Sequence, residues 1–74
     1  MVTTEDILHL VNAAALSVPA ARLAIDSPLV AQGLDSLDVA TLMVEVESAY
    51  KIDMPSDQLA NRWSVRDIVE FLNR

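Results

Sequence analysis

The sequence contains no cysteine, one glycine, one histidine and only three aromatic residues in 74 positions. Without cysteine the chain forms no disulfide and offers no thiolate to a metal ion. A single histidine provides no imidazole pair for a zinc site, and the acids lack the alternating spacing of a calcium-binding loop. We therefore expect no metal site of either kind.

Basic residues are also scarce, with five Lys and Arg against eleven Asp and Glu and a net charge of −6. Proteins that bind nucleic acid use clusters of Lys and Arg to contact the phosphates, so this charge balance argues against a nucleic-acid partner. A signal peptide has basic residues near its start, where this chain has Glu5 and Asp6. No apolar run approaches the roughly 20 residues that are needed to cross a membrane. We expect a soluble, cytoplasmic protein.

The length leaves room for one domain, which we assign to residues 1–74. Hydrophobic residues make up 53% of the chain and many are Ala or Val, which predicts closely packed helices. The chain starts at Met1 and stops at Arg74 directly after its last predicted helix. These ends favour a discrete protein over an excised module. We also expect a monomer.

Apolar residues recur at spacings of three and four, as on the buried face of a helix, in three segments. The predicted helices run over about 4–17, 36–50 and 64–73, and a brief helical turn capped by Ser56 is predicted at 57–61. The fold class is therefore all-α. We expect a four-helix bundle with three main helices, one short helix and a long first connection.

The predicted helix starts carry capping residues, which are Thr3 or Thr4, Asp35 or Ser36, and Ser64. Asp67 completes an approximate capping box with Ser64, and Trp63 before it predicts a hydrophobic staple.

The connection 18–35 has no sustained period and holds two of the three prolines. Ser27 followed by Pro28 predicts a capped short helical turn, and Gly33 supplies the backbone freedom to enter the next helix. The segment is predicted to lie across the bundle through its apolar residues, which are Leu23, Ile25, Leu29 and Val30.

The second predicted helix is more apolar than one buried face requires. Its predicted core face is Leu42, Val46 and Ala49, flanked by Val39, Met43 and Tyr50. Its predicted polar stripe is Asp38, Thr41, Glu45 and Ser48. Ala40 and Val44 remain beside that stripe, and an exposed apolar strip among acids is what a docking surface looks like.

Ser36 stands where the connection becomes this helix, and a serine at that position most often serves only as a cap. Its neighbours suggest more. The run Gly33-Leu34-Asp35-Ser36-Leu37-Asp38, the later Leu42, Val46, Glu47 and Tyr50, and Ile52-Asp53-Met54-Pro55 resemble the acyl carrier protein family. The last helix, Ser64 to Leu72, is similar to the closing helix of that family, so the resemblance covers essentially the whole chain.

The resemblance implies a non-catalytic carrier. Ser36 would receive a 4'-phosphopantetheine arm from coenzyme A through a phosphopantetheinyl transferase that uses magnesium. The thiol of the arm would hold acyl groups as thioesters. Asp35 and Leu37 match motif positions beside the serine, where Asp35 would orient the serine or help hold the metal of the transferase, and Leu37 would be a partly buried apolar anchor.

Docking residues are expected next to the serine. The segment 35–47 contains four acids and no base, which predicts partners with basic surfaces. The expected docking residues are Asp38, Ala40, Val44, Glu45 and Glu47. The expected partners are the transferase, an acyl-loading ligase or acyltransferase, and condensing or tailoring enzymes of fatty-acid, polyketide or related biosynthesis.

Two features favour a specialised, polyketide-type pathway over general fatty-acid synthesis. The run Asp26-Ser27-Pro28-Leu29 is similar to the loop of polyketide carriers, and Thr41 stands where fatty-acid carriers commonly have an acid. An aminoacyl or peptidyl carrier of nonribosomal peptide synthesis is the alternative within the family.

The residues alone leave open two functions other than that of a carrier, namely an enzyme and an interaction domain. A nucleophilic enzyme would pair Ser36 with His9, but the glycine-flanked elbow of a catalytic serine is missing and the chain hardly encloses a substrate pocket. An unmodified acidic helical interaction domain would explain the charge but not the residue order around Ser36.

Overall fold

The computed structural model describes residues 1–54 and 62–74 and is all-helical there, with no strand, which confirms the predicted fold class. Its elements are α1 (Thr4–Ala13), the 3-10 turns η1 (Ala20–Arg22) and η2 (Leu29–Gln32), α2 (Ser36–Tyr50) and α3 (Val65–Leu72). The predicted short helix at 57–61 and its cap Ser56 lie outside the described residues. None of the described helices has the length and apolar content that crossing a bilayer requires.

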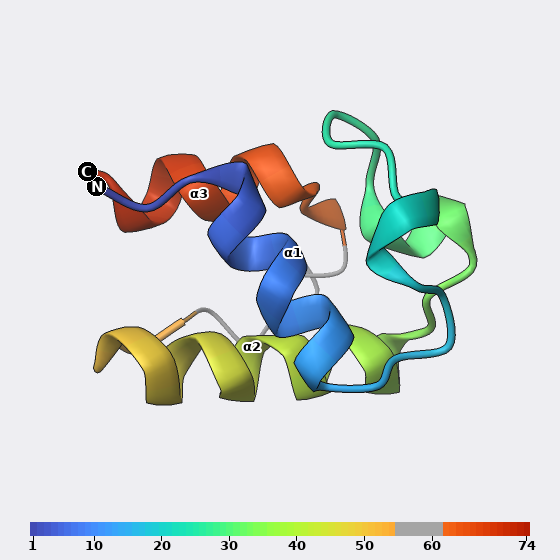
Figure 1. The fold of residues 1–74 in the computed structure, drawn as a ribbon, viewed down its shortest axis with the longest axis horizontal. Coiled ribbons are helices and arrows are strands. Elements are labelled where there is room, and N and C mark those ends of the chain that lie inside the picture. Colours follow the sequence, from blue (N-terminus) through green and yellow to red (C-terminus); the bar gives the residue numbers. More distant parts are fainter. Residues whose placement is uncertain (55–61) are drawn as a thin grey trace.

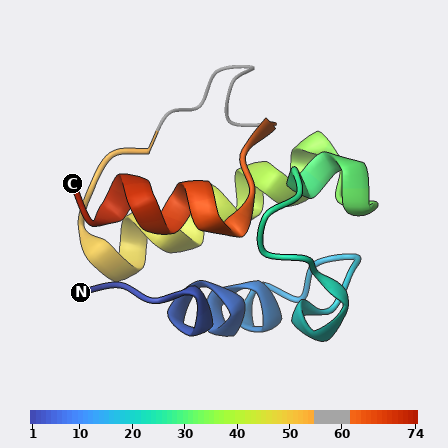
Figure 2. The same cartoon turned by 90° about the horizontal axis from the view of Figure 1, so that it is seen from above.

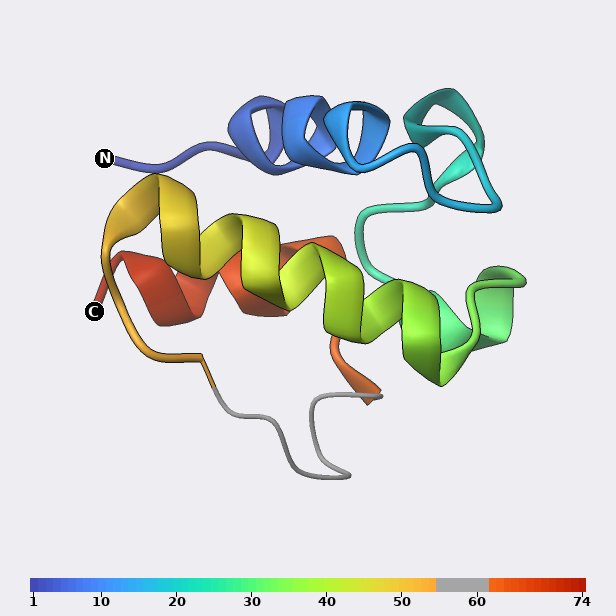
Figure 3. The same ribbon diagram turned by 90° about the horizontal axis from the view of Figure 1, so that it is seen from below.

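Helix α1 packs against both α2 and α3. Figures 1 and 3 show the two termini at one end of the molecule and the connection between α1 and α2 at the opposite end. Figure 2 shows α3 in front of α2, with α1 running below both. The amide N–H of Val2 donates to Oδ1 of Asn73 at 2.9 Å and Nδ2 of Asn73 donates to the Val2 carbonyl at 2.8 Å, which ties the two ends together.

The three α-helices of the described residues begin with the same reciprocal arrangement. The cap side chain accepts the N–H of the residue three positions on, and the aspartate at that position accepts the N–H of the cap. The pairs are Thr3 with Asp6, Asp35 with Asp38, and Ser64 with Asp67. Each pair satisfies N–H groups that a helix start leaves without partners, so the predicted caps are confirmed, with Thr3 and Asp35 chosen over their neighbours.

The core draws on every described helix and on the connection between α1 and α2. Its largest fully buried side chains are Ile7, Val11, Leu29, Leu34, Val39, Leu42, Val46, Val65 and Ile68. The prediction for Ala49 is wrong, because this alanine is exposed. Ala49 lies only about 20° around the helix from the fully buried Leu42, but it stands almost two turns later, at the end of α2, so its exposure depends on how far the packing extends along the helix and not on periodicity. Burial, and then the negative charge of Asp6, raises the pKa of Tyr50.

Helix α1 ends at Ala13, four residues before the predicted end. Ala15 has a left-handed backbone with φ of 53°, and its N–H bonds the Asn12 carbonyl. The side chain of Asn12 then accepts the N–H of Ala20 at 3.1 Å. Hydrophobic periodicity could not locate the end of α1, because a run of alanines is compatible with continued helix. The hydrogen bond between Asn12 and Ala20 forms only in the folded chain.

The connection lies across the bundle as predicted, with Leu23 and Leu29 buried, although Val30 is 40% exposed. Its shape depends on Gln32, which the sequence reasoning missed. Oε1 of Gln32 accepts the N–H of Ala24 at 2.6 Å, while its Nε2 donates to the carbonyls of Ala24 at 3.0 Å and Ser27 at 2.9 Å.

The predicted cap Ser27 is wrong, because Pro28 occupies the cap position of η2 and no side chain caps this turn. The Ser27 carbonyl instead accepts the bond from Gln32, which holds the backbone of the connection in place.

The connection is attached to the start of α3 through backbone contacts. The Leu29 N–H donates to the Trp63 carbonyl at 2.9 Å, and the Arg66 N–H donates to the Ile25 carbonyl at 3.1 Å. The guanidinium of Arg66 also pairs with Asp26 at the surface. The ring of Trp63, predicted as a staple, lies 5.3 Å from the ring of Phe71.

We predict opposite effects for glycine at two adjacent positions. Ala15→Gly should raise the free energy of unfolding by up to about 1 kcal/mol, because glycine tolerates a left-handed backbone that costs other residues about 1–2 kcal/mol. Ala14→Gly, in a right-handed helical conformation, should lower it by about 0.5–1 kcal/mol. Urea unfolding measures both values, and equal losses in the two variants would contradict the left-handed turn.

We also predict that the connection contributes to stability as strongly as a helix does. Leu29→Ala should cost about 2–5 kcal/mol, because it truncates a fully buried side chain. The matched change Val30→Ala at the exposed neighbour should stay within about 0.5 kcal/mol. Similar unfolding midpoints for both variants would show that the connection does not belong to the core.

Candidate functional site

Ser36 is the first residue of α2, and its side chain is exposed. The cap is Asp35, whose Oδ1 accepts the N–H of Asp38 at 2.8 Å, while Oδ2 of Asp38 accepts the N–H of Asp35 at 3.3 Å. No hydrogen bond to the hydroxyl of Ser36 occurs within residues 1–54 and 62–74. The carboxylate of Asp35 therefore caps the helix, and the hydroxyl of Ser36 is not needed for capping.

The approach to Ser36 is held by two residues. Gly33 has φ of 101°, and a Cβ added there would lie 3.4 Å from Cγ2 of Val18. A residue with a Cβ rarely adopts a φ of this sign, so this position favours glycine. Leu34 follows and is 2% exposed, so it anchors the chain in the core immediately before the site. The predicted need for Gly33 is confirmed.

Leu37 differs from the prediction. It was expected to be a partly buried anchor, and it is 74% exposed. Leu37 and the buried Leu42 lie on different sides of α2, since about 100° separates successive residues. Of the two leucines that flank Asp35 and Ser36, Leu34 is the one that anchors the chain in the core, and Leu37 presents its side chain to solvent.

Helix α2 carries an exposed apolar strip between two acidic flanks. Leu37, Ala40 and Val44 form this strip, which we call the α2 ridge, and Val44 is 58% exposed. Helix geometry places Ser36 and Glu47 on one flank, and Asp38 and Glu45 on the other. The acids at 38, 45 and 47 are half-buried.

The electrostatic character of this face is negative. Among the described residues, the acids of α2 form no ion pair, and the only salt bridge joins Arg66 to Asp26 elsewhere on the surface. Thr41 contributes no charge and donates its hydroxyl to the Leu37 carbonyl at 3.0 Å. Unpaired acids around an exposed apolar strip attract basic surfaces over distances set by the ionic strength.

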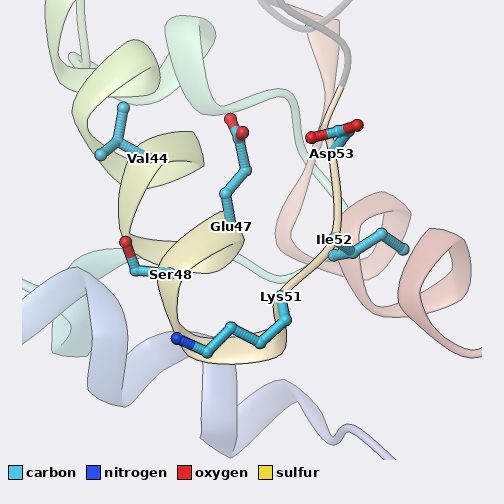
Figure 4. A pocket seen from close by; sticks show the side chains of 6 residues that line it. All are labelled: Val44, Glu47, Ser48, Lys51, Ile52 and Asp53. Carbon is cyan, nitrogen blue, oxygen red and sulfur yellow. The ribbon is translucent and has the colours of Figure 1, made fainter.

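A surface pocket of about 350 Å³ lies at the far end of the same helix (Figure 4). Its lining residues are Val44, Glu47, Ser48, Lys51, Ile52 and Asp53. It therefore includes one member of the α2 ridge and one of the flanking acids. The sequence reasoning did not find this pocket, because it depends on how the chain leaves the helix after Lys51.

His9 does not complete a catalytic site with Ser36. It is exposed on α1, in a shallow groove shared with Glu5, Leu8 and Asn12, and no hydrogen bond links it to the serine. In the part of the chain that the structure describes, no group of three His, Cys, Asp or Glu residues is placed to hold a metal ion.

Comparison with known proteins gives one family and one relative. The family model described as "Phosphopantetheine attachment site" matches residues 5–72. A curated protein named "Acyl carrier protein", from Amoebophilus asiaticus (strain 5a2), is 38% identical over 42 residues, which are 57% of this chain and 52% of that protein. The match thus spans about half the length of this relative. No solved structure matches the chain significantly.

We predict that the two neighbours at the start of α2 contribute differently to stability. Asp35→Ala should lower the free energy of unfolding by about 0.5–2 kcal/mol, because it removes the cap. Ser36→Ala should change it by less than about 0.5 kcal/mol, because this side chain is exposed and not needed as a cap. Thermal or urea unfolding tests both, and a larger loss in Ser36→Ala would contradict the assignment of the cap to Asp35.

Proposed function

Since the chain belongs to the phosphopantetheine attachment-site family, we propose that Ser36 is the residue that bears the arm and that the protein acts as an acyl carrier. The arm ends in a thiol, which gives a chain without cysteine the ability to hold acyl groups as thioesters. In this role the protein presents its cargo to separate enzymes and catalyses no step itself. The single observation that carries the proposal is the exposed, uncommitted hydroxyl at the start of α2.

The surroundings of Ser36 fit a phosphodiester. The side chain is exposed, so a bulky group can be attached without displacing the core. The start of a 15-residue helix favours negative charge, because its first N–H groups and the helix dipole point toward that end. Asp35 and Asp38 oppose this effect with their own charges. Their carboxylates already accept N–H groups, which keeps them at fixed positions beside the phosphate.

Asp35 has a second role in this proposal. Its Oδ1 accepts the Asp38 N–H, and its other oxygen makes no hydrogen bond within the described residues. A carboxylate next to the acceptor hydroxyl is a suitable ligand for magnesium, which prefers oxygen ligands. Asp35 would thus hold the serine in place through the capping box while contributing an oxygen to the metal of the transferase.

The cargo is proposed to be acyl and not aminoacyl. The relative from Amoebophilus asiaticus carries the name "Acyl carrier protein", which supports this choice for the part of the chain that it matches. We place the carrier in a specialised, polyketide-type pathway, on the strength of the Pro28 connection and the uncharged Thr41.

Docking is proposed to use the α2 ridge and its acidic flanks. Ala40 and Val44 are exposed and supply apolar contact, while Asp38, Glu45 and Glu47 supply the charge. A carrier has to leave each enzyme after visiting it, so small, salt-sensitive contacts suit the task better than a large apolar interface. The partners would be a phosphopantetheinyl transferase, an enzyme that loads the acyl group, and condensing or tailoring enzymes with basic docking surfaces.

We predict that incubation with coenzyme A and a broad-specificity phosphopantetheinyl transferase adds one phosphopantetheine to the chain. Intact-mass analysis should show the gain in the native protein and in Ser17→Ala, which removes another exposed serine. The gain should be absent in Ser36→Ala. A native protein that gains no mass would favour an unmodified interaction domain, and a gain in Ser36→Ala would place the arm elsewhere.

We also predict a charge effect on the rate of this transfer. Glu47→Lys should slow it several-fold at low salt, because it reverses a charge beside the α2 ridge. The matched Glu70→Lys, on the exposed side of α3, should leave the rate near that of the native protein. The difference should shrink at high salt, as the Debye length falls from about 10 Å at 0.1 M to about 3 Å at 1 M. Equal rates for the two variants would refute the docking assignment.

A further inference from the structure

A second pocket, of about 210 Å³, lies along α3, and we call it the α3 pocket. Its lining residues are Trp63, Asp67, Glu70, Phe71 and Arg74. At about 100° per residue, Asp67, Glu70 and Phe71 fall within about 100° of the helix circumference. The fully buried Val65 and Ile68 lie outside that sector, so the α3 pocket is on the side of the helix that the core does not use.

Two aromatic rings form the apolar part of the α3 pocket. The ring centroids of Trp63 and Phe71 are 5.3 Å apart, and the ring planes are tilted by 50°. Both side chains are half-buried, so part of each ring faces solvent. The face of an aromatic ring carries partial negative charge and attracts cations, and Trp does so most strongly.

One guanidinium of the chain already lies against these rings. Cζ of Arg74 is 5.5 Å from the centroid of the Phe71 ring, within the distance of about 6 Å at which a cation attracts a ring. Arg74 lies beyond the end of α3 and is exposed, and exposed side chains change rotamer within nanoseconds. The Phe71 ring thus accepts the group that an arginine of another protein would present, and Arg74 can give way to it.

Two carboxylates provide the polar part of the α3 pocket. Glu70 forms no ion pair within the described residues, where Arg66, one turn earlier, pairs with Asp26. Asp67 accepts the N–H and the hydroxyl of Ser64 with Oδ2 alone, at 2.9 Å and 3.1 Å, so its Oδ1 makes no hydrogen bond among these residues. Free carboxylate oxygens beside ring faces match the N–H groups of a guanidinium, which bonds carboxylates in a fork geometry.

We propose that the α3 pocket binds an arginine side chain of a partner protein. The incoming guanidinium takes the place of that of Arg74, stacks on Phe71 beside Trp63, and donates N–H groups to Glu70 and Asp67. Arginine suits this site better than lysine, because a planar guanidinium stacks on aromatic rings, is more weakly hydrated than an ammonium group and carries five N–H donors.

The α3 pocket is separate from the docking surface proposed on α2. It shares no residue with the α2 ridge or with the acids beside it, so the inference does not rest on the modification of Ser36. A partner held at α3 and an enzyme docked at the α2 ridge therefore need not compete for the same side chains. Because the pocket accommodates a single side chain, we expect the contact to be weak and sensitive to salt.

The test titrates three capped tripeptides into the isotope-labelled protein at low salt and follows the NMR signals. The peptides are Gly-Arg-Gly and its counterparts with lysine or citrulline in the middle. Trp63 is the only tryptophan, so its indole N–H signal reports on the α3 pocket. The arginine peptide should shift this signal to saturation, and the lysine peptide should bind several-fold more weakly. The citrulline peptide has a similar shape without the charge and should not shift it.

Three variants sharpen the result. Arg74→Gln should tighten binding of the arginine peptide several-fold, because it removes the competing guanidinium. Glu70→Gln should weaken binding several-fold, whereas the matched Glu5→Gln, on the exposed side of α1, should leave it unchanged. All three positions are exposed, so the variants are expected to fold.

Three results would overturn the inference. Equal affinities for the arginine and lysine peptides would indicate general attraction to a chain with a net charge of −6. Shifts on α2 with an unmoved Trp63 signal would place the peptide on the other surface. Unchanged affinity in Arg74→Gln would mean that the peptide does not replace this side chain. Intact mass tests the carrier function independently, so a protein that gains the arm but does not bind the arginine peptide at Trp63 refutes this inference alone.

Discussion

The reciprocal hydrogen bonds between Asp35 and Asp38 are the interaction on which the site depends. A helix start has N–H groups that need acceptors, and the residue that supplies an acceptor is committed to that task. Here Asp35 takes it, so Ser36 begins α2 with a hydroxyl that no helix contact requires. The same carboxylates hold the negative charge of the site in fixed positions. The same capping box thus stabilises the start of α2 and positions the charged groups beside Ser36.

The rest of the fold holds the capping box of Asp35 and Asp38 at the protein surface. Leu34 buries its side chain just before the site, and Gly33 provides the left-handed backbone that allows it. Behind them, Gln32 organises the connection through three hydrogen bonds, and contacts to Trp63 and Arg66 attach the connection to α3. These hydrogen bonds, within the connection and from it to α3, provide the support, because the connection has little regular structure of its own.

Helix α2 has two apolar faces with different roles. One face, with Leu42 and Val46, is fully buried, and the opposite α2 ridge is exposed between acids. An excess of apolar residues for one buried face was evident from periodicity, which is why Ala40 and Val44 were expected at the surface. The exposure of Leu37 was missed, because a leucine next to a functional residue reads equally well as an anchor. The pocket beyond Val44 was also missed, since its walls form where the chain leaves the helix.

By itself the sequence determined the helical class, the capping box of Ser64 with Asp67, the range of α2 and the position of Ser36 at its start, because these depend on local spacing and on hydrogen bonds between residues three positions apart. It located the other two helix starts but left two candidate caps at each, and the structure chose Thr3 and Asp35. The tertiary structure decided where α1 ends, which loop residues are buried, that Leu34 and not Leu37 anchors the site, and that a pocket lies at the end of α2. Those features depend on partners beyond the spacing of a helix turn, such as Ala20 for Asn12 and Ala24 for Gln32, each eight residues away, and on the more distant Trp63 for Leu29. Periodicity and propensity contain no information about such pairs, since the contacts exist only once the helices have packed.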